Sequence, residues 1–247
     1  ADRPTVVFFP DTFTNYNDPH IGIAAVEVLE CAGYRVILAE PRKCCGRPFI
    51  SKGMLRQAKA VAEYNIEQLD RYASQGWPIV GCEPSCLMTF RDDYLDLVDD
   101  PRAKRVADHI FLIDEFLAQE HEAGRLRLSF KKVNKTLKLH GHCQQKAIVG
   151  IEPTMTALKL VPGYEVTALN TGCCGMAGSF GYEKEHFDIS MKIAEDRLFP
   201  AVRDDKEEAE FVAPGTSCRH QLAEGLGCRA KHPIEYIREA MQDNGEW

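Results

Sequence analysis

The triplet Cys-Cys-Gly occurs twice in the chain, at 44–46 and 173–175, and is the pattern best suited to chemistry. A disulfide between adjacent cysteines closes a strained ring, and two neighbouring loop thiols have no packing role that Ala or Ser could not fill. The glycine permits a sharp turn that presses the backbone against a bulky group. The triplets therefore favour a metal or cluster site over inert cysteines.

The cysteines also mark an internal repeat. GYRVILAEPRKCCG matches GYEVTALNTGCCG, and EPSC, which ends at Cys86, matches GTSC, which ends at Cys218. Upstream, Asp11 in FPDT falls opposite Cys143 in HGHC. All these landmarks keep an offset of 129 to 132 residues. The near-constant offset indicates two copies of one unit.

Within each copy, short apolar runs alternate with amphipathic segments. Strands are expected at 5–9, 34–40 and 78–82, and again at 136–140, 164–170 and 210–214. Helices are expected at 18–33, 51–76, 85–98, 144–160 and 183–202, and from about 217. This alternation predicts an α/β fold of two pseudo-symmetric repeats, each a small parallel sheet flanked by helices. The expected division is a first repeat at 1–100, a helical connector at 101–132, and a second repeat at 133–247 that includes a closing helix.

Parallel strands bring the residues that follow them to one edge of the sheet, where helix N-termini favour thiolates. The candidate metal ligands at these positions are Cys44, Cys45, Cys82, Cys86, Cys143, Cys173, Cys174 and Cys218. The candidate cofactor-binding residues are Asp11, Gly46, Gly175, His142 and His220.

Asp11 occupies a ligand position by repeat symmetry, and an N-cap role is the alternative. His140, His142 and His220 lie close in sequence to the cysteines. We expect each histidine to donate a hydrogen bond to a thiolate, or to be a satisfied core residue, rather than to ligate a metal.

The identity of the metal is less constrained than its location. Several thiolates suit either zinc or an iron–sulfur cluster. Structural zinc usually closes small loops with CxxC pairs, whereas these cysteines come from three strand ends far apart in the sequence. The layout favours an iron–sulfur cluster and leaves zinc open at one site.

Composition excludes several classes of partner. The net charge is −7 and the pI about 5.7, so no basic stripe is expected to bind nucleic acid. No apolar run approaches the ~20 residues of a spanning helix, and the N-terminus does not read as a signal peptide. A cytoplasmic protein is expected, with peripheral association at the inner membrane left open. The chain begins with Ala1 rather than Met, which suggests processing or an excised piece.

The motifs resemble the cysteine-rich CCG domain family of iron–sulfur oxidoreductases, which includes components of heterodisulfide reductase and of glycolate oxidase. FPDTFTNY, CCGRPFISKG, GCEPSCLMTFRDDY, HGHCQQKA, TGCCGMAGSFGYE and APGTSCRHQ are most similar to one branch. That branch is the C-terminal portion of bacterial proteins that fuse an FAD-linked 2-hydroxyacid dehydrogenase to an iron–sulfur oxidoreductase. The resemblance covers nearly the whole chain.

The resemblance implies one or two 4Fe–4S clusters, with a non-cubane form left open and with five ligands for each copy. The first copy has Asp11 at the first ligand position and CEPSC in place of CxxC, and the second has Gly215 where a further cysteine would fall. Each site is therefore at least one thiolate short of the family pattern. This departure keeps zinc open for one of them.

The function implied is that of an electron-transfer module of a flavin-dependent dehydrogenase for D-lactate, glycolate or D-2-hydroxyglutarate. Neither a ferredoxin-like CxxCxxCxxxCP run nor a flavin-binding segment is recognisable in the sequence. The chain is thus expected to be an oxidoreductase component that is not catalytically complete alone. Its expected partners are an FAD-binding dehydrogenase domain, a ferredoxin-like domain, and a quinone or other acceptor. Two alternatives are a zinc-stabilised docking domain and a module for thiol/disulfide chemistry at a cluster.

Overall fold

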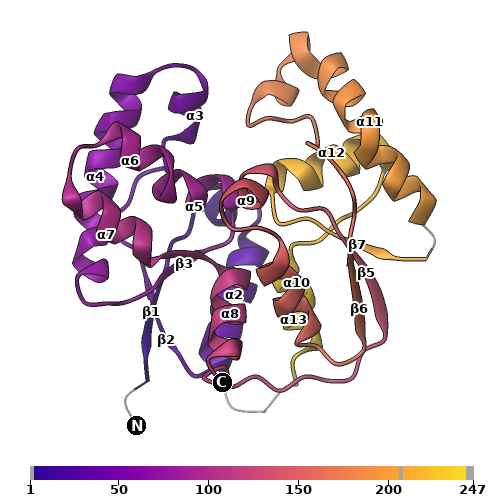
Figure 1. Cartoon of the computed structure of the whole chain (residues 1–247), viewed down its shortest axis with the longest axis horizontal. Coiled ribbons are helices and arrows are strands. Elements are labelled where there is room, and N and C mark those ends of the chain that lie inside the picture. The colour runs from indigo at the N-terminus through magenta and orange to yellow at the C-terminus, as the bar shows by residue number, and fades with distance from the viewer. Residues whose placement is uncertain (1–2, 206–207, 243–247) are drawn as a thin grey trace. The chain divides into compact units, whose positions relative to one another are not determined.

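The computed structural model describes residues 3–205 and 208–242. It divides into two compact units, Ala1–Phe116 and Leu117–Trp247, here called unit 1 and unit 2. Each unit contains a small parallel sheet flanked by helices (Figure 1). The predicted α/β fold with two related parallel sheets is confirmed.

Unit 1 contains a four-stranded sheet in the order β2-β1-β3-β4. All its strand pairs are parallel. The strands are β1 (Thr5–Phe8), β2 (Arg35–Leu38), β3 (Ile79–Gly81) and β4 (Ile110–Leu112). The helices are α1 (Thr12–Tyr16), α2 (Pro19–Cys31), α3 (Arg47–Ser51), α4 (Leu55–Ala73), α5 (Pro84–Arg91), α6 (Asp93–Leu97), α7 (Pro101–His109) and α8 (Ile113–Glu122), the last of which continues into unit 2.

Unit 2 contains a three-stranded parallel sheet in the order β6-β5-β7. Its strands are β5 (Lys135–Leu139), β6 (Tyr164–Ala168) and β7 (Glu210–Val212). Its α-helices are α9 (Cys143–Ile148), α10 (Glu152–Lys159), α11 (Phe187–Asp205), α12 (Thr216–Leu226) and α13 (Pro233–Ala240). Two short 3₁₀ turns, Phe180–Tyr182 and Lys184–His186, precede α11.

The two sheets repeat the same arrangement, as the sequence repeat predicts. In each, the first strand of the copy lies in the centre, between the second and third strands. Both central strands carry buried apolar side chains: Val6 and Val7 in β1 and Leu137 and Leu139 in β5 have no exposed surface. Burial of these side chains is the main stabilising contribution to each sheet. Because the central strand is flanked on both sides, the loop after it lies between the loops after its neighbours.

Three of the predicted long helices are interrupted, and the segment 85–98 forms α5 and α6 rather than one helix. The segment 144–160 forms α9 and α10, because Pro153 has no backbone N–H and is accommodated only in the first turn of a new helix. The segment 51–76 begins instead with a turn at Gly53, whose φ is +69°, and only then continues as α4. The segment expected to be a helical connector, 101–132, includes β4, which pairs with β3 in the unit 1 sheet. None of the described helices is both long enough and apolar enough to span a membrane.

Candidate metal centres

In unit 1, three thiols from two loops lie in mutual contact. Cys44 and Cys45 follow β2, and Cys86 lies in the first turn of α5 after β3. The Cys45 thiol hydrogen-bonds with both Cys44 and Cys86. Cys45 and Cys86 are buried, whereas Cys44 is exposed. The parallel sheet therefore gathers these sulfurs at the carboxyl ends of its strands, with one of them at the surface.

Two buried carboxylates complete this group. Asp11 follows β1, is 2% exposed, and caps α1 by accepting hydrogen bonds from the backbone N–H groups of Phe13 (2.9 Å) and Thr14 (3.0 Å). Burial, and then the charge of Glu83, raises the pKa of Asp11 to about 6. A hydrogen bond with Cys45 lowers the pKa of Cys86, but burial and the nearby Asp11 and Glu83 outweigh it and raise that pKa to about 11. Oxygen and sulfur donors thus share one small region of unit 1, which we call the unit 1 centre.

A buried pair of side chains holds the Cys44–Cys45 loop in place. The Asn65 side chain, from α4, accepts from the backbone N–H of Lys43 (2.9 Å) and donates to the carbonyl of Cys44 (3.1 Å). The Tyr94 hydroxyl donates to the carbonyl of Cys45 (2.8 Å) and accepts from Asn65 (3.1 Å). Both side chains are at most 1% exposed. The loop conformation is therefore fixed by hydrogen bonds to its backbone, which leaves the thiols available.

Asn65→Leu is expected to destabilise unit 1 by roughly 1 to 3 kcal/mol, because it leaves backbone groups of the cysteine loop without their partners. Urea unfolding measures this loss. Glu67→Leu, on the exposed side of the same helix, is the matched control and should change stability by less than about 0.5 kcal/mol. Equal stability of the two variants would show that the Asn65 contacts do not hold the loop.

In unit 2, four thiols come together from three segments: the start of α9, the loop after β6 and the first turn of α12. The Cys173 thiol hydrogen-bonds with Cys143 and with Cys174, and the sulfur atoms of Cys174 and Cys218 are 3.4 Å apart. Cys174 and Cys218 are buried, and Cys143 and Cys173 are exposed. Hydrogen bonds from its neighbours lower the pKa of Cys173, and a hydrogen bond from Cys174 lowers the pKa of Cys218 well below its usual range. The same hydrogen bonds raise the pKa of Cys143 and Cys174 well above the usual range. This cluster, which we call the unit 2 centre, therefore includes two sulfurs that favour thiolate, the form that binds metal.

An imidazole belongs to the same group. One ring nitrogen of His140 and the sulfur atoms of Cys174 and Cys218 all lie within 4.8 Å of one another. His140 is 2% exposed and follows β5, the central strand. We expected His140 to donate a hydrogen bond or to be a core residue, not to bind the cofactor. His140 directly follows the central strand, at the sheet edge where the cysteine-bearing segments also begin. This position in the sequence could have identified it as a candidate.

Backbone geometry brings the second Cys-Cys-Gly triplet close to α11. Gly175 has a φ of +94°, and a Cβ built on it would lie 2.2 Å from the Ser190 carbonyl oxygen. The Gly175 N–H donates to the Cys173 sulfur at 3.3 Å. Lys146 donates to the carbonyl of Thr171 (2.7 Å), just before the triplet. The glycine is therefore required by a left-handed backbone and by a close approach to a neighbouring helix.

Gly175→Ala is expected to destabilise unit 2 by about 3 kcal/mol or more, since backbone strain and a backbone clash add. Gly172→Ala is the control, because a Cβ there has no atom within 4 Å. Denaturant unfolding of both variants measures the difference. A Gly175→Ala protein as stable as the control would contradict the packing described here.

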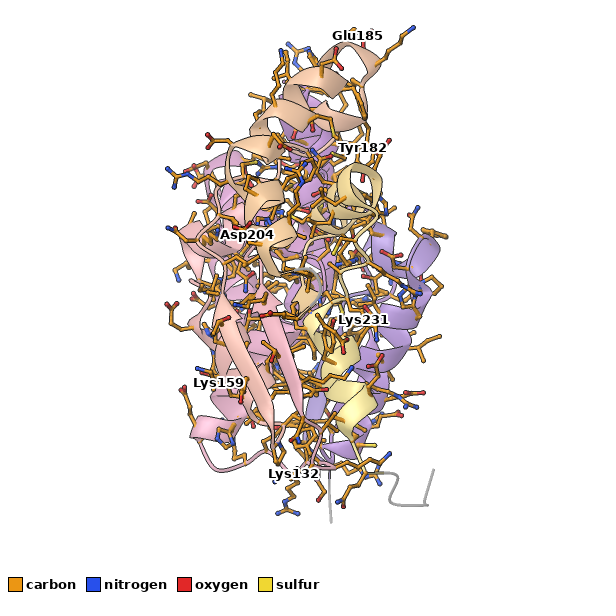
Figure 2. All side chains as sticks on the ribbon, turned by 90° about the vertical axis from the view of Figure 1, so that its right-hand side faces the viewer. Lys132, Lys159, Tyr182, Glu185, Asp204 and Lys231 are labelled. Atoms are coloured by element: carbon orange, nitrogen blue, oxygen red, sulfur yellow. The ribbon has the colours of Figure 1, made fainter. Side chains whose placement is uncertain are left out.

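The remaining predicted residues lie as follows. His142 is buried beside Gly215, where a built Cβ would lie 2.5 Å from the His142 Cδ2 atom. His220 shares a hydrogen bond of 2.6 Å between its Nδ1 and the Tyr182 hydroxyl. Figure 2 shows Tyr182 at the end of unit 2 opposite Lys132, which precedes β5. Cys82 is buried at the end of β3, and its role as a ligand stays a prediction.

The donors present fit a metal that prefers sulfur. Each centre combines buried and exposed cysteine sulfurs drawn from separate strand ends, and the unit 2 centre adds an imidazole. Thiolate and imidazole donors select zinc, copper or iron–sulfur clusters rather than magnesium or calcium. The left-handed backbone at Gly46 (φ +82°) and at Gly175 favours glycine directly after each cysteine pair. The residues could therefore hold a zinc ion or an iron–sulfur cluster.

Comparison with known proteins assigns the family. The profile of the CCG family, described as a cysteine-rich domain, matches residues 6–91 and 138–223, one match for each copy of the repeat. Together these matches cover more than half of the chain. The chain therefore belongs to the CCG cysteine-rich domain family.

Three relatives are similar over nearly the whole chain. One component of the anaerobic glycerol-3-phosphate dehydrogenase of Escherichia coli K12 is 29% identical, over 97% of this chain and 60% of its own length. D-2-hydroxyglutarate dehydrogenase of the same organism is 27% identical, over 96% of this chain and 23% of its own length. Lactate utilization protein A of an Exiguobacterium strain is 26% identical, over 97% and 98%. The chain thus spans only part of the first two relatives.

Proposed function

We propose that the chain is the iron–sulfur electron-transfer module of a flavin-dependent 2-hydroxyacid dehydrogenase. In this proposal the chain takes electrons from a flavin held by another domain and passes them to a quinone or another carrier. The observation that carries the proposal is the convergence of cysteine sulfurs from separate strand ends, once in each unit.

The relatives support a redox role. Two of the three are named as dehydrogenases or dehydrogenase components. The comparison supports a dehydrogenase partner domain, and we propose such a domain, that it binds FAD, and that a ferredoxin-like domain accompanies it. The 2-hydroxy acid is proposed to be D-lactate, glycolate or D-2-hydroxyglutarate, the last by similarity to a D-2-hydroxyglutarate dehydrogenase.

The exposure of the sulfurs is consistent with transfer across a surface. Cys44 in unit 1, and Cys143 and Cys173 in unit 2, are exposed, while their partners are buried. An iron–sulfur cluster, when bound, supplies reversible one-electron chemistry. The buried cysteines would shield that chemistry from water, and the exposed ones would bring it within reach of a partner. A purely structural zinc site has no need of this exposed side.

The test is reduction of the chain by a flavin. The protein is loaded anaerobically with iron and sulfide and mixed with photoreduced FAD, and the visible absorption is followed by stopped flow. We expect rapid bleaching, and recovery when a water-soluble quinone is added. A chain that holds one zinc per unit, takes up no iron or sulfide, and does not respond to reduced FAD would overturn the proposal in favour of a docking domain. A spectral change on adding a thiol, without reduction by FAD, would instead indicate thiol/disulfide chemistry.

A further inference from the structure

His140 occupies the centre of the unit 2 sheet edge. It directly follows β5, and its backbone N–H continues the ladder by donating to the carbonyl of Val212 (2.9 Å) in β7. The strand on the other side, β6, leads into the loop with Cys173 and Cys174. The His140 side chain therefore lies between the two loops that deliver cysteines.

The distances suit donors around one metal. The ring nitrogen of His140 and the sulfur atoms of Cys174 and Cys218 lie within 4.8 Å of one another, with the two sulfurs 3.4 Å apart. Donors around a tetrahedral thiolate and imidazole site are ~3.5 to 3.8 Å apart, given metal–sulfur and metal–nitrogen bonds of about 2.3 and 2.0 Å. For a single metal ion, small side-chain adjustments convert the observed group into a coordination sphere, whereas in a 4Fe–4S cluster the three donors would bind different irons and would have to move farther apart.

The orientation of the imidazole is already fixed. Its Nδ1 shares a hydrogen bond of 2.7 Å with the Thr171 hydroxyl. Thr171 is itself held, because its backbone N–H donates to Leu169 (2.9 Å) and its carbonyl accepts from Lys146 (2.7 Å). Nε2 is therefore the nitrogen left to face the sulfurs. Metal-bound histidines typically have their second nitrogen held by an oxygen in this way.

The repeat explains why unit 2 uses an imidazole. The unit 1 counterpart of Gly215 is the buried carboxylate Glu83, so unit 2 has lost a donor side chain at that position. The space beside Gly215 is filled by the His142 ring. The unit 1 counterpart of His140 in the strand register is Phe9, a core residue with no metal-binding atom. Compared with unit 1, unit 2 thus lacks a donor side chain after its third strand, at Gly215, and has an additional one after its first strand, at His140.

We propose that His140, through Nε2, is a direct ligand of the metal in unit 2, beside Cys174 and Cys218. This rests on the proposed function only in placing an iron–sulfur cluster there. The unit 2 centre is then a mixed imidazole and thiolate site, whereas the unit 1 centre combines thiolates with carboxylates. An imidazole ligand in place of an anionic one raises the reduction potential of a cluster, so clusters bound at the two centres would be expected to differ in potential.

The test is pulsed electron paramagnetic resonance of the whole chain, labelled with ¹⁵N-histidine and loaded anaerobically with iron and sulfide. We expect a strong coupling to a histidine nitrogen, lost in His140→Gln and retained in His142→Gln, the matched buried neighbour. Thr171→Val removes only the positioning contact and should alter the coupling without abolishing it. A loaded cluster without nitrogen coupling, or a coupling lost in His142→Gln and kept in His140→Gln, would overturn the proposal.

A second arm separates this proposal from the proposed function. The chain is loaded with Co²⁺ alone, whose absorption bands report the number of sulfur and nitrogen donors. One outcome would be that no iron–sulfur cluster assembles, but the cobalt spectrum changes in His140→Gln and not in His142→Gln. That result would contradict the proposed electron-transfer function and still support His140 as a metal ligand. If cobalt binds identically in both variants, His140 is not a ligand.

Discussion

Cys218→Ser is expected to remove the metal from unit 2 and leave unit 1 loaded, so that the whole chain loses about half of its bound iron. Cys218 is 1% exposed and contacts Cys174 at 3.4 Å, with the His140 imidazole beside both. A serine hydroxyl stays protonated at neutral pH and is a poor ligand for a thiophilic metal. Iron and sulfide analysis of the anaerobically loaded protein measures the loss.

Cys228→Ser is the matched control for this change. Cys228 is 6% exposed and belongs to the same hydrophobic cluster as Cys174 and Cys218. Replacing Cys228 should disturb the packing of this cluster about as much as replacing Cys218. Equal loss of iron in the two variants would therefore mean that the iron is lost through damaged folding and not through a missing ligand. Retention of full iron by Cys218→Ser would exclude Cys218 from the centre.

Cys86→Ser should produce the opposite pattern, with the unit 1 centre emptied and the unit 2 centre intact. Cys86 is 4% exposed and its thiol contacts Cys45, which in turn contacts Cys44. The electron paramagnetic resonance signal that carries the histidine coupling should survive, because it belongs to unit 2. Spectra of Cys86→Ser and Cys218→Ser should therefore add up to the spectrum of the unchanged chain.

Cys31→Ser provides the control for Cys86→Ser, because Cys31 is exposed at the end of α2. It should retain both signals. Cys82→Ser tests the sequence-based assignment of Cys82 separately, and loss of the unit 1 signal is expected if Cys82 is a ligand. Loss of both signals on replacing Cys86 alone would contradict two independent centres.

The repeat made much of the fold and site predictable. Because parallel strands end at one edge, the 129 to 132 residue offset was enough to expect that Cys44, Cys45 and Cys86 meet. In the structure they do, and Cys143, Cys173, Cys174 and Cys218 meet in the same way. Helix boundaries were less predictable, since a turn at Gly53 and the start of α10 at Pro153 depend on local backbone geometry.

The supporting residues could not be found from spacing. Asn65 and Tyr94 come from helices distant in sequence, and only the packing of α4 and α6 against the cysteine loop brings them to its backbone. His140 and His142 are two residues apart, and both lie close enough to Cys218 to lower its pKa. Among the described residues, however, only the ring of His140 places a nitrogen in one compact group with the sulfurs of Cys174 and Cys218. Sequence position identifies which loops meet, whereas side-chain direction decides which residues ligate.

The most direct test of the central claim is anaerobic metal and sulfide analysis of the chain together with its electron paramagnetic resonance spectrum. We expect iron and acid-labile sulfide in both units, with two distinguishable signals on reduction. Stoichiometric zinc without sulfide, and no signal on reduction, would contradict it.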